Sequence, residues 1–151
     1  MENATLYEVL QLAVHLEEEG QKFYEKYAQK AKGDIKETFE RLALDEVKHG
    51  KYFQSLYHEA KEKPGLDYLF EEEVTAYFKE YAVSAAFDRE ETKVMSVEEA
   101  VAEAILTEKK SIDYYKYLDK YALTETKGMI NTIIQEEEKH LAVLEKLLEA
   151  M

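Results

Sequence analysis

The chain contains no cysteine, and this absence removes several kinds of site at once. Without a thiol there is no disulfide, zinc–thiolate centre, iron–sulfur cluster or cysteine nucleophile. Tryptophan is also absent, and 151 residues include only one proline and five glycines. Proline and glycine favour turns, so their scarcity argues against an all-β fold, which needs many turns. The remaining composition, rich in Glu, Lys, Ala, Leu and Tyr, favours helices.

Positive charge is scarce as well, since the formal net charge is −13. Nucleic acids and anionic membranes require a basic surface, so we predict neither as a partner. The acidic excess could gather cations, but the solvated outer faces of helices explain it more simply. No apolar run approaches a membrane span, and Met1 leads directly into a helical pattern without a signal peptide. We therefore predict a soluble, cytoplasmic protein with a single domain over residues 1–151.

The residues that are present form an internal repeat with an offset of 91 positions. Each copy has a lone Glu followed 29 residues later by Glu-x-x-His, which gives Glu17, Glu46 and His49 in the first copy and Glu108, Glu137 and His140 in the second (108−17 = 137−46 = 140−49 = 91). The wider match covers residues 5–57 and 96–148 without a gap, and both copies open with a capping box at Thr5 or Ser96.

Apolar positions three, four and seven apart predict two helices in each copy, over residues 6–31 and 35–61 and over 97–121 and 126–149. The residues between the copies, 62–95, form a long crossover with a short amphipathic helix near 66–81. Its aromatic face is interpreted as an extra core layer in preference to a partner surface. The predicted fold class is all-α, a four-helix bundle of two α-hairpins joined by one crossover.

Spacing brings the six repeated side chains to one level of this bundle. Glu17 and His49 each lie 16 residues from the break at Gly33, which corresponds to about 24 Å along a helix. The second copy has the same spacing around Thr124. Buried together, four carboxylates need compensating cations, and two divalent ions supply four positive charges. Oxygen ligands with one imidazole per metal suit iron or manganese, with zinc as an alternative.

The remaining histidines provide an internal comparison. His15 lies about 200° around its helix from Glu17, and His58 lies about 180° from His49, so neither is expected to be a ligand. One Glu-x-x-His alone would be a weak signal, because the pattern is common on polar helix faces. Two copies at a matched spacing make the metal site the favoured interpretation.

Two further pairs of residues fall close to the predicted site. Tyr24 and Tyr115 follow the lone Glu of each copy by seven positions, and either fill the core or donate hydrogen bonds to the metal ligands. Asp45 and Glu136 directly precede a ligand Glu, and either face solvent or orient the histidine of the opposite hairpin.

Four phrases resemble the rubrerythrin family of ferritin-like di-iron proteins: AVHLE…FY over 13–24, LALDEVKH over 42–49, AILTE…YY over 104–115 and QEEEKH over 135–140. The resemblance implies a ferritin-like bundle with two iron ions. It also implies four carboxylate ligands, two of them bridging, and His49 and His140 as terminal ligands. An external electron donor and a homodimer are expected with it.

Two departures limit the functions that the resemblance implies. Rubrerythrins that reduce peroxide usually carry a cysteine-rich rubredoxin domain, which a chain without cysteine lacks. They also carry an extra Glu one turn after the third-helix ligand, where this chain has Ser111. The favoured function is a di-iron oxidoreductase of the peroxidase type that reacts with H2O2 or O2. The alternatives are a ferroxidase or iron-handling protein, and a non-enzymatic bundle stabilised by metal.

Overall fold

The computed structural model describes residues 6–62, 95–122 and 124–151. They form four long helices: α1 (Leu6–Lys30), α2 (Gly33–Glu62), α4 (Val97–Tyr121) and α5 (Thr124–Ala150). Each lies within about two residues of its predicted range, and the all-α expectation is confirmed. The capping box predicted at Thr5 and the short helix predicted in the crossover lie outside the described residues.

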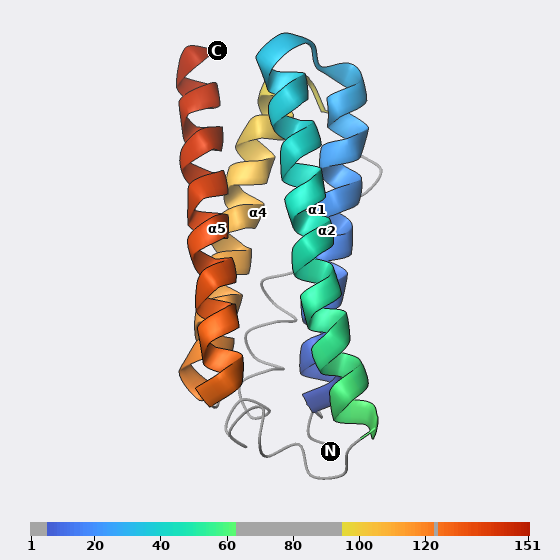
Figure 1. Cartoon of the computed structure of the whole chain (residues 1–151). Coiled ribbons are helices and arrows are strands. Elements are labelled where there is room, and N and C mark those ends of the chain that lie inside the picture. Colours follow the sequence, from blue (N-terminus) through green and yellow to red (C-terminus); the bar gives the residue numbers. More distant parts are fainter. Residues whose placement is uncertain (1–5, 63–94, 123) are drawn as a thin grey trace, which may run out of the picture.

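The helices form two antiparallel hairpins that lie side by side (Figure 1). The turn between α1 and α2 is at one end of the bundle, whereas α4 ends and α5 begins at the other end (Figure 1). The second hairpin is therefore inverted relative to the first. A half-turn about an axis across the bundle exchanges the two copies of the repeat, so equivalent residues meet from opposite directions.

Local sequence determines where the helices begin. Ser96 caps α4, since its Oγ accepts a hydrogen bond from the Glu99 amide at 3.1 Å and Glu99 Oε1 accepts one from the Ser96 amide at 3.3 Å. Between α1 and α2, Gly33 has a φ of 61°, a conformation that favours glycine. Helix α2 already begins there, so the predicted start after Asp34 was late, and Asp34 lies inside the first turn.

Two apolar clusters fill the bundle, one toward each end. The first gathers the N-terminal parts of α1 and α5 with the C-terminal parts of α2 and α4, around Leu10, Phe53 and Tyr115. The second gathers the opposite parts of the same helices, around Tyr27, Phe39 and Leu144. Between them lies a buried layer of polar residues. Among the described residues, no helix is long and apolar enough to cross a membrane.

The capping box gives a test of how α4 is held. Replacing Ser96 with Ala removes the acceptor for the Glu99 amide and should lower the free energy of unfolding by about 1 kcal/mol. Urea unfolding followed by circular dichroism measures this loss. Ser55→Ala is the control, because the exposed Ser55 hydroxyl donates a hydrogen bond to the Lys51 carbonyl one turn back in the same helix and caps no helix end. Equal losses from both changes would contradict the proposed role of the cap.

Candidate metal centre

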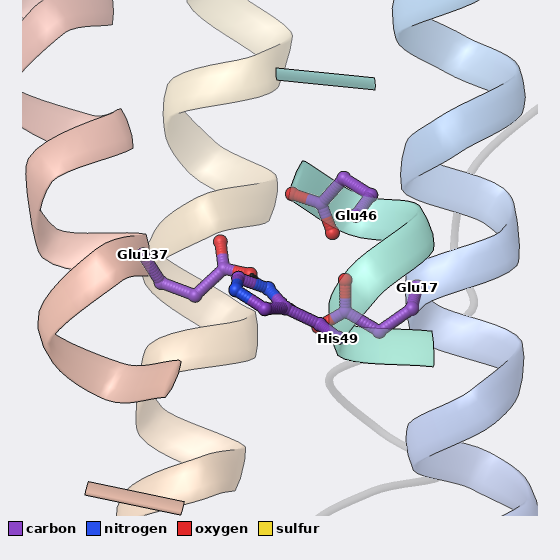
Figure 2. Close-up of side chains that lie close together, drawn as sticks. All are labelled: Glu17, Glu46, His49 and Glu137. Atoms are coloured by element: carbon purple, nitrogen blue, oxygen red, sulfur yellow. Dashed lines mark hydrogen bonds and ion pairs between the residues drawn. The ribbon is translucent and has the colours of Figure 1, made fainter. Parts of the chain in front are cut away.

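The polar layer in the middle of the bundle consists of the six repeated residues. None of them is more than 5% exposed, although all carry carboxylate or imidazole groups: Glu17, Glu46, His49, Glu108, Glu137 and His140. Figure 2 shows side chains from α1, α2 and α5 that point toward one another. The structure thus brings together all six residues that the spacing predicted to meet.

The six side chains divide into two overlapping groups. One consists of Glu17, Glu46, His49 and Glu137, and the other of Glu46, Glu108, Glu137 and His140. Within each group, one ligand atom per residue lies within 4.8 Å of all the others. Glu46 and Glu137 belong to both groups, so these two carboxylates would be shared if each group held a metal ion. Each group also takes residues from both hairpins.

Carboxylates of the opposite hairpin fix the two imidazole rings. His140 Nε2 lies 3.0 Å from Asp45 Oδ2, and His49 Nε2 makes the equivalent short contact with Glu136 Oε2. Each Nε2–H can donate to its carboxylate, which leaves Nδ1 facing the centre of the cluster. Of the two alternatives, Asp45 and Glu136 are therefore placed to orient the histidine of the opposite hairpin, although about half of the Glu136 side chain stays exposed.

Two buried tyrosines also bind across the hairpins. Tyr24 donates a hydrogen bond to Glu108 Oε1, and Tyr115 donates one to Glu17 Oε1, both at 2.6 Å. The half-turn that relates the hairpins exchanges these two bonds. Both rings are also packed in the apolar clusters, so each tyrosine both fills the core and donates a hydrogen bond to a buried carboxylate.

Burial makes these carboxylates difficult to ionise in the metal-free protein. Desolvation, with repulsion from Glu137, raises the pKa of Glu17, Glu46 and Glu108 well above the usual value. Glu137 is the exception. Burial favours its neutral form, but interactions with Glu108, His140 and His49 outweigh burial and lower its pKa. The metal-free cluster therefore holds protons that cations would displace.

Several buried atoms of the cluster lack a hydrogen-bond partner, namely one carboxylate oxygen each of Glu17, Glu108 and Glu137 together with His140 Nδ1. Within the described residues, Asp119 Oδ1 is the one other buried side-chain atom in this state. Leaving such atoms unpaired is costly unless another group satisfies them. Because these atoms are carboxylate oxygens and an imidazole nitrogen, and their residues belong to the two groups of converging side chains, the residues fit a pair of metal ions.

Two glycines beside the cluster were missed in the sequence prediction. A side chain at Gly20 would contact the Glu46 carboxylate, and one at Gly50 would contact Cβ of Glu17. The sequence does contain a signal for them, since the repeat aligns these glycines with Ser111 and Leu141. The two comparison histidines, His15 and His58, belong to neither metal-binding group.

Comparisons with known proteins agree with this geometry. The rubrerythrin family model matches residues 8–148. A solved structure from Thermotoga maritima, of a candidate ferritin-like diiron-carboxylate protein, is 25% identical with a TM-score of 0.71. The alignment covers 99% of this chain and 97% of that one. No curated protein matches. The fold is that of the ferritin-like four-helix bundles, and the chain belongs to the rubrerythrin family.

The protonated cluster predicts how stability changes with pH in the metal-free protein. Burial would lower the pKa of His49, but hydrogen bonding and charge interaction with Glu137 raise it from 6.5 to about 9. A histidine whose pKa is higher in the folded protein than in the unfolded chain stabilises the fold fully below the unfolded value of 6.5. This stabilisation is lost as the pH rises through the folded value of about 9. The carboxylates with raised pKa values also make the folded protein less stable as the pH rises, because at a pH above their ordinary pKa they are ionised in the unfolded chain but keep their protons in the folded one. We expect the melting temperature to fall between pH 6.5 and 9.

Thermal unfolding in a chelating buffer measures this trend. His49→Gln should show a shallower decline than the wild type, because the titrating imidazole is removed while the buried carboxylates with raised pKa values still titrate in the variant. A metal-free wild-type protein that becomes more stable between pH 7 and 9 would disprove the interpretation.

The tyrosine contacts predict a matched pair of effects. Tyr24→Phe and Tyr115→Phe each remove a hydrogen bond to a buried carboxylate, so each should lower the free energy of unfolding by about 1–3 kcal/mol. Both should also weaken metal binding. Tyr27→Phe serves as the control, because the equally buried Tyr27 hydroxyl accepts a hydrogen bond from the Met95 amide. Chemical unfolding and Co(II) titration report the two effects, and wild-type metal affinity in both site variants would contradict them.

Proposed function

We propose that this chain is a di-iron oxidoreductase of the peroxidase type, which passes two electrons to H2O2. The observation that carries the proposal is the set of six buried carboxylate and imidazole side chains, four of whose atoms lack a hydrogen-bond partner. Membership of the rubrerythrin family and the likeness to a candidate diiron-carboxylate protein support iron as the metal.

The donor set supports two similar metal positions. Each position has three carboxylates and one imidazole, counting the shared Glu46 and Glu137 in both. Hard oxygen ligands with one imidazole suit iron or manganese, and zinc is the redox-inactive alternative. Four carboxylates balance the charge of two divalent ions. When bound, two ferrous ions would supply two electrons and polarise the O–O bond of the substrate.

The protein's own residues control position and protons. Asp45 and Glu136 hold the imidazoles so that Nδ1 faces the metal positions. Tyr24 and Tyr115 hold one oxygen each of Glu108 and Glu17, which leaves the second oxygen for metal. Reduction of H2O2 to two water molecules consumes two electrons and two protons. Because the chain has no cysteine, we propose that an external donor supplies the electrons.

A ferroxidase is the second candidate, in which Fe(II) is the substrate and O2 the oxidant. The residues one turn after Glu17 and Glu108 favour it, because they are Gly20 and Ser111 and provide no additional carboxylate. A peroxidase that relies on such a carboxylate would need a different route here. The ligand set is compatible with both reactions, so the preferred oxidant distinguishes them.

Anaerobic Fe(II) titration of the metal-free protein, followed by rapid mixing with H2O2 or O2, tests the proposal. We expect two Fe(II) ions per chain, one for each ligand group. Optical absorption should show the iron oxidised faster by H2O2 than by O2. Glu108→Gln keeps the shape of the side chain but removes a ligand charge, and should weaken iron binding at least about tenfold.

Glu138→Ala is the control, because Glu138 is exposed and pairs with Lys116 on the surface. It should bind and oxidise iron as the wild type does. Faster oxidation by O2, with turnover beyond two irons per chain, would favour the ferroxidase. Absence of iron binding would overturn the di-iron assignment. A large rise in melting temperature with metal and no oxidation would identify a structural site.

A further inference from the structure

Gly20 lies in the middle of α1 and is buried. Glycine inside a helix is unfavourable, because the unfolded chain loses more conformational freedom there than with alanine. The φ of Gly20 is not positive, so the backbone does not require glycine at this position. We therefore attribute the glycine to a lack of room for a side chain at this position.

The space at Gly20 is filled by the Glu46 side chain from α2. A Cβ atom at position 20 would lie 3.2 Å from Glu46 Oε2 and 3.3 Å from Glu46 Cδ. These distances are shorter than ordinary contacts of a Cβ atom, so the carboxylate would have to move by a few tenths of an ångström. The Glu46 carboxylate thus rests directly against the bare backbone of α1.

Glu46 and Glu137, the two carboxylates that belong to both groups, are held in place by different neighbours. Glu137 lies between both imidazoles, with His49 Nδ1 at 2.8 Å from one oxygen and His140 Nδ1 at 3.4 Å from the other. The nearest ring nitrogen recorded for Glu46 is His140 Nδ1, at 3.6 Å. Imidazoles therefore hold Glu137 in place, whereas the contact with α1 limits the position of Glu46.

The repeat is broken at this contact. The six repeated carboxylate and histidine residues and the two tyrosines recur at an offset of 91. Gly20, by contrast, corresponds to Ser111, and Gly50 corresponds to Leu141. The close approach of a helix backbone to a shared carboxylate is therefore a property of the first hairpin. Since Glu46 belongs to both ligand groups, its placement bears on both metal positions.

We propose that Gly20 is a positioning residue, whose missing side chain lets the Glu46 carboxylate lie where it reaches both metal positions. The proposal rests on the metal centre proposed above. Metal–ligand distances tolerate changes of only about 0.2 Å, so a displacement of a few tenths of an ångström removes Glu46 from one of the two ions.

Titration of the metal-free chain with Co(II) tests the proposal, because visible absorption of Co(II) reports coordination as well as occupancy. The wild type should bind two ions per chain, one in each ligand group. Gly20→Ala should weaken binding of the second ion at least about tenfold and change the absorption spectrum of the loaded protein. The metal-free variant should melt at the same temperature as the wild type or higher, since alanine favours the helix.

Two glycine variants serve as controls. Gly128→Ala introduces the same change in α5, where a Cβ would meet nothing within 4 Å. Gly50→Ala adds a methyl group between α1 and α2, but meets Glu17 Cβ at an ordinary 3.4 Å. Both should bind two Co(II) ions as the wild type does. An equal loss in Gly50→Ala would assign the effect to crowding of the helices and overturn the proposal.

A double variant shows whether Gly20 acts through Glu46. In a Glu46→Ala background, Gly20→Ala should cause no further loss of Co(II) affinity, because the carboxylate that it displaces is absent. An additional loss would overturn the proposal, as would wild-type binding by Gly20→Ala alone. A wild-type protein that binds no Co(II) or Fe(II) would instead disprove the metal centre.

Discussion

The burial of four carboxylates in the middle of the bundle is the constraint on which the rest of the structure depends. Anions enclosed between two apolar layers are strongly unfavourable unless they keep protons or gain cations. The raised pKa values of Glu17, Glu46 and Glu108 show the first solution, and the unpaired oxygen atoms indicate the second. The hydrophobic clusters stabilise the helices, while the polar layer determines how the two hairpins must face each other.

Specific contacts between the hairpins are concentrated at this layer. The bonds of Tyr24 and Tyr115 and the histidine contacts of Asp45 and Glu136 all run from one hairpin to the other. Each metal-binding group also draws on both hairpins. The site is therefore complete only when the two hairpins are docked, so the geometry of the six buried residues is coupled to how the hairpins pack.

The repeat and the helical periodicity were sufficient to predict the four helices and the meeting of the six repeated side chains, because both follow from regular helix geometry. Contacts determined by the distance between helices could not be predicted. The spacing did not reveal that Tyr24 reaches Glu108 in the opposite hairpin, or that Gly20 lies against Glu46. The early start of α2 was missed because the positive φ of Gly33 is a property of the turn.

The half-turn that relates the hairpins has a consequence for how such a centre can arise. One hairpin carries three of the six residues of the buried polar layer, and a second copy placed around the same axis would supply the other three. A chain of half the length could thus build the whole centre as a symmetric pair of molecules. Joining the halves in one polypeptide frees them to diverge, and the differences between Asp45 and Glu136 and between Gly20 and Ser111 record that freedom. In a symmetric pair of identical chains, by contrast, every substitution would change both halves of the site at once.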